Sequence, residues 1–403
     1  MEIFDIAVIG GGASGLTAAI CAKRAAPKLR VAVLERLPRV GKKLLACGNG
    51  RCNYTNINIS KEKYHGSCAE LIDKIGSFDV RDFFASLGVY GFSDSEGRVY
   101  PLSENAGSIL DGLRLEADKL GIETICECSV DEINVGKVFR IFSGKREFTA
   151  KWVILAGGGM SQSALGSDGS VLRLAKKLGL QCAPLRPALT PLKTVPELVR
   201  PLKGLRANAL VTLFCGEKAV GSEVGEVQFG DGTLSGICVM NLSHFYRENE
   251  SFSLSLDLLP EKTESEILSL LCELKKIREK APLEDFLSGL FHKRVGIYLL
   301  KKCTSHALTE PSRVISEKEL ENAARLIKSL RFPVVGAAGF EKSQVTAGGI
   351  LFSELTARLE CRKIRGLFCC GEMLDIAGDC GGYNLTFAFA SGAAAGKNAA
   401  EGL

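Results

Sequence analysis

The sequence lacks the features that mark several large classes of proteins. No block of lysine and arginine is long enough to indicate a nucleic-acid-binding arm, and the net charge of +5 is small for 403 residues. No uninterrupted apolar run reaches about eighteen residues, which argues against a membrane-spanning helix. The apolar start of the chain carries acidic residues where a signal peptide has basic ones, and a glycine cluster interrupts it. We therefore expect a cytoplasmic protein with neither a membrane nor a nucleic acid as its partner.

Histidine is scarce, and the four histidines of the chain are dispersed. No cysteine or histidine completes a zinc-binding spacing, so we expect no metal site. The 15 cysteines are scattered through apolar segments, and without an export signal most should be reduced, buried, small hydrophobic residues. No Ser/His/Asp triad or pair of carboxylates stands out, so the sequence names no general base.

The start of the chain has the pattern of a dinucleotide-binding turn. The apolar strand "FDIAVIG" leads into "GGGASG", which gives the spacing Gly10-x-Gly12-x-x-Gly15, and a small-residue helix and a second strand ending at Glu35 follow. Gly10 permits the tight turn, Gly12 lets the backbone approach a pyrophosphate, and Gly15 lets the helix pack closely on the strand. Glu35 stands where an acid accepts hydrogen bonds from a ribose diol. Because strand, helix, second strand and acid come in the expected order, the segment predicts a bound dinucleotide.

Two later glycine clusters favour FAD as that dinucleotide. "KWVILAGGG" and "GLFCCGEMLD" each end an apolar strand, and Glu372 or Asp375 is placed to hold a ribityl hydroxyl. In "GDCGGYNLTFAFASGAAAGKNAA", Gly381 and Gly382 begin a helix rich in alanine and glycine. The N-terminal N–H groups of such a helix suit the partly negative ring of a reduced flavin. A small-residue helix packed on a sheet is the alternative interpretation, and the two are compatible.

The segment "LLACGNGRCNYTN" allows three interpretations. Cys47 and Cys52 have the spacing of a redox disulfide as in flavoprotein disulfide reductases, but those enzymes need a second glycine-turn domain and a C-terminal histidine. No further strand-GxGxxG-helix unit appears, and no histidine follows His306. The second interpretation, which we favour, is a cofactor cradle with Cys52 as a packing residue, and the third is a plain loop. In the cradle, glycines give close backbone approach, asparagines give hydrogen bonds, and the cations for phosphate oxygens are Lys42, Lys43 and Arg51.

The chain resembles the HI0933-like flavoproteins, a bacterial family also labelled the aminoacetone-oxidase or BaiN family of FAD-binding enzymes. The matching pieces are "IAVIGGGASGL", "GKKLLACGNGRCNYTN", "VILAGGG…GSDGSVLRLAKKLGL", "TAGGI", "GLFCCGEMLDIAGDCGGYN" and "ASGAAAGKNA", which together cover nearly the whole length. The resemblance implies an oxidoreductase with one FAD, held by a domain built from both ends of the chain. Two positions depart from the family pattern: Cys47 replaces a small residue, and Thr386 replaces a glutamine.

The middle of the chain changes character after a series of prolines. Residues 208–259 alternate or run apolar between glycine turns, which indicates strands, and residues 261–330 have the apolar spacing of helices, with Thr263 or Glu264 as the first cap. We expect this insertion to exclude water as a lid or to form the substrate pocket. The predicted class is α/β, a discontinuous Rossmann-like FAD-binding domain with an inserted β subdomain and a small helical subdomain. The predicted domains are 1–185 with 345–403, 186–260 with 331–344, and 261–330.

The sequence thus predicts a FAD-dependent oxidoreductase that moves a hydride between a small organic substrate and flavin N5. Oxygen or NAD(P)H is the expected electron partner, and the oligomeric state is open. The competing interpretations are a flavin-dependent tRNA-modifying enzyme and a non-catalytic flavin-binding redox sensor. Tyr383 and Asn384 are the candidates for contact with substrate or ring. The residues expected to bind the cofactor are Gly10, Gly12, Ala13, Ser14, Gly15, Glu35, Arg36, Lys42, Lys43, Asn49, Gly50, Arg51, Cys52, Asn53, Val130, Ala156, Gly157, Gly158, Gly371, Glu372, Asp375, Gly381, Gly382, Tyr383, Asn384 and Leu385.

Overall fold

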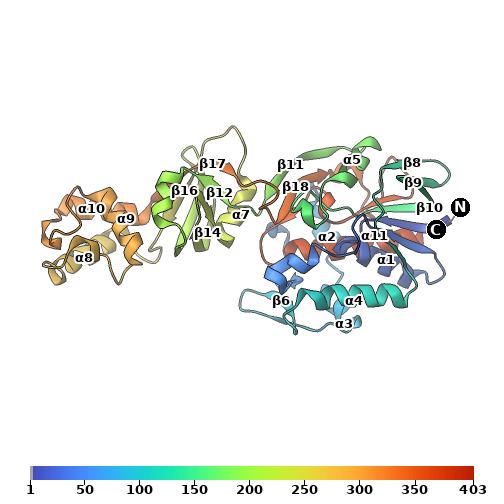
Figure 1. Cartoon of the computed structure of the whole chain (residues 1–403), viewed down its shortest axis with the longest axis horizontal. Coiled ribbons are helices and arrows are strands. Elements are labelled where there is room, and N and C mark those ends of the chain that lie inside the picture. The colour runs from blue at the N-terminus through green and yellow to red at the C-terminus, as the bar shows by residue number, and fades with distance from the viewer. Residues whose placement is uncertain (1–2) are drawn as a thin grey trace. The chain divides into compact units, whose positions relative to one another are not determined.

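The computed structural model describes residues 3–403. The chain divides into two compact units (Figure 1). The first unit joins the two ends of the chain, Met1–Ala188 with Gly339–Leu403, and the second comprises Leu189–Ala338. Within the described residues, no helix combines the length and the apolar character needed to cross a bilayer.

A largely parallel sheet forms the centre of the first unit. Its parallel strands lie in the order β7-β2-β1-β10-β19, and an antiparallel extension, β9 and β8, pairs with the first half of β10. The central strands are largely apolar and buried: every residue of β2 and β19 is buried, as are the last residues of β1 and β10, whereas β7 at the edge is more exposed. This burial is expected where a parallel sheet is covered on both faces. The strands are β1 (Ile3–Ile9), β2 (Val31–Leu34), β7 (Glu123–Ile125), β8 (Glu132–Asn134), β9 (Phe139–Ser143), β10 (Arg146–Leu155) and β19 (Leu367–Cys369).

Two helices from opposite ends of the chain pack side by side in this unit: α1 (Ala13–Ala25) and α11 (Tyr383–Glu401) (Figure 1). Their approach is so close that a Cβ atom at Gly392 would lie 2.3 Å from the carbonyl oxygen of Ser14. A Cβ atom at Gly396 would lie 2.0 Å from the carbonyl oxygen of Ala18. Because both contacts advance by four residues, the two helices run in the same direction.

Smaller elements complete the first unit around this centre. Three further sheets are antiparallel, with the orders β3-β6-β5, β20-β4 and β11-β18. Their strands are β3 (Thr55–Asn56), β4 (Tyr64–His65), β5 (Gly91–Ser93), β6 (Arg98–Pro101), β11 (Cys182–Ala188), β18 (Val345–Ile350) and β20 (Ala377–Gly378). The remaining helices are α2 (Leu71–Ile75), α3 (Val80–Ser86), α4 (Ala106–Lys119) and α5 (Ser170–Lys177).

The second unit contains a closed antiparallel barrel in the order β12-β15-β14-β13-β16-β17. Closure leaves no free sheet edge, and alternate residues of β13 such as Val211 and Leu213 are buried in its core. The elements around the barrel are β12 (Leu192–Thr194), α6 (Pro196–Val199), β13 (Arg206–Cys215), β14 (Lys218–Phe229), β15 (Thr233–Ser235), α7 (Ile237–Leu242), β16 (Phe252–Asp257) and β17 (Leu330–Ala337).

Three longer helices of the second unit lie between β16 and β17 in sequence: α8 (Glu264–Ile277), α9 (Lys293–Cys303) and α10 (Glu317–Lys328). Thr263 caps α8 and forms a reciprocal capping box with Glu266, and Ser316 and Glu319 do the same for α10. One apolar cluster continues from the barrel strands into these helices. The expected fold class, a discontinuous Rossmann-like domain with an insertion of strands and helices, is confirmed.

We expect Gly396→Ala to destabilise the protein by about 1–3 kcal/mol, because the added methyl group forces α1 and α11 apart. The substitution would otherwise favour the helix by about 1 kcal/mol, so the sign of the effect separates packing from propensity. Urea unfolding measures the difference, with exposed Lys397→Ala as the control on the same turn. A Gly396→Ala protein more stable than the wild type would contradict the close helix contact.

Candidate functional site

The loops that carry the predicted motifs meet at the carboxyl edge of the central sheet. Parallel strands all end at the same edge, so the residues that follow them become neighbours. A row of backbone hydrogen bonds holds these strand ends in register. The bonds run from Glu35 N to Ile125 O at 2.9 Å, from Gly10 N to Leu34 O at 2.9 Å, from Ala156 N to Ile9 O at 2.9 Å and from Cys370 N to Leu155 O at 3.0 Å.

The three glycines of the first turn have different surroundings. A Cβ atom at Gly10, whose φ is +108°, would lie 2.6 Å from the carbonyl oxygen of Ala156, and one at Gly15 would lie 1.9 Å from that of Gly10. A Cβ atom at Gly12 would meet no atom within 4 Å, and its φ of −86° suits any residue. No described neighbour therefore demands glycine at position 12. The open space in front of it fits a group that approaches the backbone, such as a diphosphate.

The N-terminus of α1 faces this open space without a side-chain cap. Gly12 is the N-cap, and the predicted residues Ala13, Ser14 and Gly15 form the first turn. Their N–H groups are the donors that a helix leaves without an intrahelical partner, and the helix dipole adds a partial positive charge there. The turn can therefore bind an anion with backbone groups alone.

Glu35 is held rigidly at the end of β2. Its two carboxylate oxygens accept hydrogen bonds from the N–H groups of Gly11 and Leu37, each at 2.8 Å, and the residue is buried. The backbone oxygen of Glu35 accepts a bond from Cys128, also at 2.8 Å, which brings the segment that leads to Val130 beside it. Each carboxylate oxygen keeps a lone pair for a further donor such as a ribose hydroxyl.

The cysteine-containing segment lies in a strained conformation. Asn49 and Cys52 have φ values of +56° and +58°, which non-glycine residues adopt rarely, and the side chain of Cys52 is fully buried. Gly50 has φ +85°, and a Cβ atom there would meet no atom within 4 Å. Backbone strain of this kind costs of order 1–3 kcal/mol per residue and concentrates at ligand-binding sites.

The start of α11 packs directly against this segment. A Cβ atom at Gly382, whose φ is +99°, would lie 2.4 Å from the carbonyl oxygen of Thr55. Asn56 donates from its side chain to the carbonyl oxygen of Gly381 at 2.9 Å, and the hydroxyls of Thr55 and Thr386 are 2.8 Å apart. The two family-specific motifs, "GRCNYTN" and "GGYN", are therefore neighbours. The Thr386 hydroxyl also donates to the carbonyl oxygen of Gly382, the N-cap of α11, at 3.0 Å.

The two helix N-termini at this site are staggered. In the register set by the contacts of Gly392 with Ser14 and of Gly396 with Ala18, α11 begins roughly eight residues before the start of α1, or about 12 Å along the helices. Like α1, α11 begins without a side-chain cap, so Tyr383, Asn384 and Leu385 contribute unpaired N–H groups. The site thus has two separate groups of N–H donors for partly negative atoms.

The predicted basic residues have protein partners. Lys43 forms a 2.8 Å ion pair with Glu372, whose second carboxylate oxygen accepts the N–H of Thr346 at 2.9 Å. Arg51 stacks on Tyr100 at 4.5 Å from the ring centre. Lys42 donates to the carbonyl oxygen of Ala164 at 2.9 Å, and Arg36 pairs with Asp168. An anion at this site would consequently depend on backbone N–H groups more than on lysine or arginine.

The predicted residues that follow β10 and β19 have contacts within the protein. Asp375 is buried and accepts the N–H of Ser67 at 2.9 Å. Gly371 has φ +77°, and a Cβ atom there would lie 2.3 Å from the hydroxyl of Ser14. Gly157 leaves no room for a Cβ atom, which would lie 2.2 Å from Val171, and Gly158 follows it with φ +71°. Gly371 therefore lets the end of β19 come close to α1, and Gly157 lets the end of β10 come close to α5.

The two candidates for substrate contact are firmly held. The Asn384 amide accepts the N–H of Gly378 and donates to its carbonyl oxygen, both at 2.8 Å, so it fixes the turn before α11. The carbonyl oxygen of Tyr383 accepts the hydroxyl of Tyr64 at 2.9 Å, and burial raises the pKa of the Tyr383 phenol. A role for Tyr383 or Asn384 toward a substrate stays a prediction.

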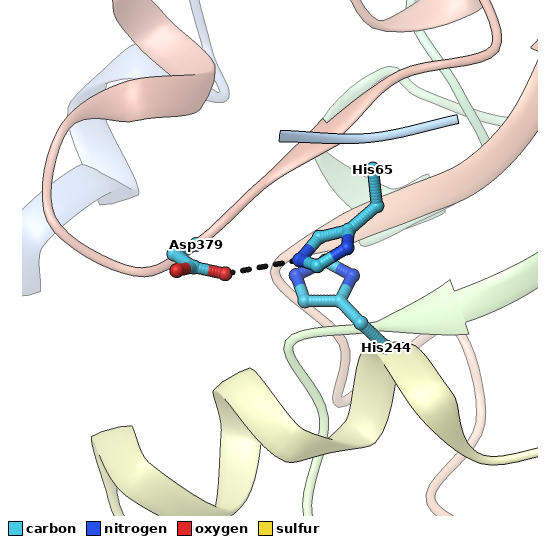
Figure 2. Close-up of side chains that lie close together, drawn as sticks. All are labelled: His65, His244 and Asp379. Carbon is cyan, nitrogen blue, oxygen red and sulfur yellow. Dashed lines mark hydrogen bonds and ion pairs between the residues drawn. The ribbon is translucent and has the colours of Figure 1, made fainter. Parts of the chain in front are cut away.

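A polar cluster beside this turn was missed from the sequence. Asp379 accepts from His65 Nε2 at 3.2 Å and lies 3.4 Å from Lys63 Nζ (Figure 2 shows the His65–Asp379 bond). Strands β4 and β20 pair and bring these residues together. No local pattern signals the contact, because Asp379 follows His65 by 314 residues.

Cys47 and Cys52 have the properties of packing residues. Both are free thiols. Burial raises the pKa of Cys47 to about 11, with a smaller opposing effect from Lys43, and burial raises the pKa of Cys52 well above its usual value. Reactive redox cysteines have lowered pKa values instead. The cradle interpretation fits this environment better than the redox pair.

Residues 4–398 match the family described as "HI0933-like protein Rossmann domain". The chain is 35% identical to the 3-dehydro-bile acid delta(4,6)-reductase of Clostridium scindens over 98% of its length and 99% of that protein. It is 26% identical to the ribosomal RNA dihydrouridine synthase of Escherichia coli, over 97% and 96% of the two chains.

Among solved structures, the chain is similar to the 3-ketosteroid-delta4-(5alpha)-dehydrogenase of Rhodococcus jostii, with a TM-score of 0.52 and 18% identity. The match covers 99% of this chain and 97% of that one. This likeness supports the fold.

We expect iodoacetamide at pH 7 to leave Cys47 and Cys52 unmodified in the folded protein. A thiol with a pKa near 11 is ionised to only about 1 part in 10⁴ at pH 7, and its reactivity rises roughly tenfold per pH unit below that pKa. Peptide mass spectrometry measures the labelling, and the urea-unfolded protein serves as the control in which every cysteine reacts. Rapid labelling of either thiol at pH 7 would restore the redox interpretation.

Proposed function

The chain belongs to the HI0933-like family and is a flavin-dependent oxidoreductase, and from this premise we propose that it reduces a carbon–carbon double bond conjugated to a ketone in a steroid-like substrate. The observation that carries this proposal is the 35% identity, over nearly the whole of both chains, to a reductase named for a 3-dehydro-bile acid. An enone of this kind accepts a hydride at the carbon remote from the ketone. The apolar ring system would supply the binding energy.

The cofactor of the chain is FAD, which supplies hydride transfer at flavin N5 when bound. We propose that the N–H groups of Gly12, Ala13 and Ser14 hold its diphosphate and that Glu35 holds the adenosine ribose. The N–H groups at the start of α11 would face the ring system, about 12 Å from the start of α1. The strained segment from Asn49 to Asn53 would lie along the cofactor between these ends.

The proposed electron donor is NAD(P)H. A reductase needs a hydride source, and the sequence contains no second strand-GxGxxG-helix unit that would hold a nicotinamide nucleotide permanently. The nicotinamide would therefore bind transiently, reduce the enzyme and leave before the enone enters.

A second candidate function comes from the relatives named ribosomal RNA dihydrouridine synthases. Reduction of a uracil ring is also hydride addition to an enone-like double bond, so the same site chemistry would serve. The net charge of +5 over 403 residues gives little basic surface for RNA. The identity to these relatives, 26%, is also lower than to the bile-acid reductase.

We expect the purified protein to be yellow and to be bleached anaerobically by NADH or NADPH. A 3-oxo-Δ4-steroid should then restore the oxidised spectrum, with a product that has gained two hydrogens by mass spectrometry. In a parallel experiment, the reduced protein is mixed with a protein-free ribosomal RNA fragment in place of the steroid. Several salt concentrations are used, because RNA binding would weaken steeply with salt. Restoration by the RNA alone would favour the second candidate. No bleaching by either nucleotide would contradict NAD(P)H as the donor.

Two glycine variants test the proposed diphosphate site. Gly12→Ala should leave the stability of the FAD-free protein within about 0.5 kcal/mol, because its methyl group meets no protein atom. It should weaken FAD binding at least about tenfold, or 1.4 kcal/mol. Gly15→Ala is the contrasting control and should lose stability as well, because its Cβ atom would lie 1.9 Å from the carbonyl oxygen of Gly10. If Gly12→Ala and the wild type bind FAD with equal affinity in a fluorescence titration, the diphosphate does not bind at Gly12.

A further inference from the structure

Lys63, His65 and Asp379 form a polar cluster in the first unit. Asp379 is buried, its carboxylate lies 3.2 Å from the His65 ring, and Lys63 lies 3.4 Å from its second oxygen. The imidazole keeps part of its surface exposed, with a side-chain exposure of 26%. A buried carboxylate thus orients a ring that can still exchange a proton with water.

The backbone around this cluster is fixed at several points. The N–H of Asp379 donates to the carbonyl oxygen of Lys63 at 2.9 Å, and His65 lies opposite Ala377 in the β4–β20 pair. The Asn384 side chain binds Gly378 on the other side of the turn. The geometry of the His65–Asp379 pair is therefore set by both the turn and the first residues of α11.

The cluster stands next to the helix start that would face the flavin ring. Asp379 precedes the N-cap Gly382 by three residues, and the ring of Tyr64, next to His65, meets the ring of Tyr383 edge-on at 6.0 Å. Lys63 and Asp379 also act electrostatically on Tyr383 with opposite signs. The pair therefore lies within the part of the site where the reacting double bond would be placed.

Reduction of an enone needs a proton as well as a hydride. The hydride brings two electrons and forms a C–H bond at the carbon remote from the ketone, and the electron pair of the double bond moves to the carbon beside the ketone. That carbon then takes a proton from an acid. A histidine next to a carboxylate suits this step, because the carboxylate stabilises the imidazolium before transfer and the neutral ring is protonated again from water.

We propose that His65, oriented by Asp379, donates this proton to the carbon beside the substrate ketone. The inference rests on the proposed function, since it concerns the protonation half of the same reduction. Asp379 is then a positioning residue that acts through His65. Lys63 Nζ, 3.4 Å from the second carboxylate oxygen, places a cation beside Asp379 on the side away from its bond with His65.

Stopped-flow measurements on the FAD-loaded enzyme separate the two half-reactions. His65→Gln should bind FAD and be reduced by NADPH at the wild-type rate within about twofold, but its reoxidation by the 3-oxo-Δ4-steroid should slow by about 10²–10⁴-fold. Asp379→Asn should slow the same step without changing KM for the steroid. In His65→Ala, added imidazole should restore part of the reoxidation rate, which a merely structural role would not allow.

His306→Gln is the matched control, because His306 also lies near two carboxylates, 3.6 Å from Glu310 and 3.8 Å from Glu319, in the second unit. It should leave both half-reactions unchanged. Wild-type reoxidation in His65→Gln, or equal slowing of both half-reactions without imidazole rescue in His65→Ala, would overturn the inference and leave the proposed function standing. If the NADPH-reduced wild type is not reoxidised by the steroid, the proposed function and this inference fall together.

Discussion

The close parallel packing of α1 and α11 is the constraint on which the site depends. Gly392 and Gly396 let the last helix lie against the carbonyl oxygens of Ser14 and Ala18, and this contact fixes both the direction and the stagger of the two helices. As a result, the two uncapped helix N-termini are offset by about 12 Å along the helices. Neither end of the chain makes this arrangement alone.

The hydrogen-bond donors that the site offers to an anion are mainly neutral backbone N–H groups. Lys43 and Arg36 form ion pairs with Glu372 and Asp168, and Arg51 stacks on a tyrosine, so much of the local positive charge is already compensated. Helix N-termini hold a diphosphate without a large net charge, which agrees with the modest charge of the whole chain. At the start of α11, glycine likewise lets the backbone come close, since a Cβ atom at Gly382 would lie 2.4 Å from the carbonyl oxygen of Thr55.

Local signals in the sequence were enough to predict the first turn, the class of fold and the presence of an insertion. Gly10, Gly12, Gly15 and Glu35 predict their own neighbourhood because each acts through the strand or helix that contains it. The partners of the basic residues and the closure of the barrel were not predictable, since both depend on residues distant in sequence. The His65–Asp379 contact is the extreme case, because 314 residues separate its partners. The hydrogen bonds of Asn384 to Gly378 were also not predictable, and its expected contact with substrate or ring stays a prediction.

The most direct test of this account is hydrogen–deuterium exchange on the FAD-loaded and FAD-stripped protein. If both ends of the chain enclose one cofactor, FAD should slow exchange together in the peptides that contain residues 10–16, 44–56, 127–130 and 381–386. The barrel strands of the second unit serve as an internal reference. Protection confined to the first turn, with no change at the start of α11, would contradict the shared site.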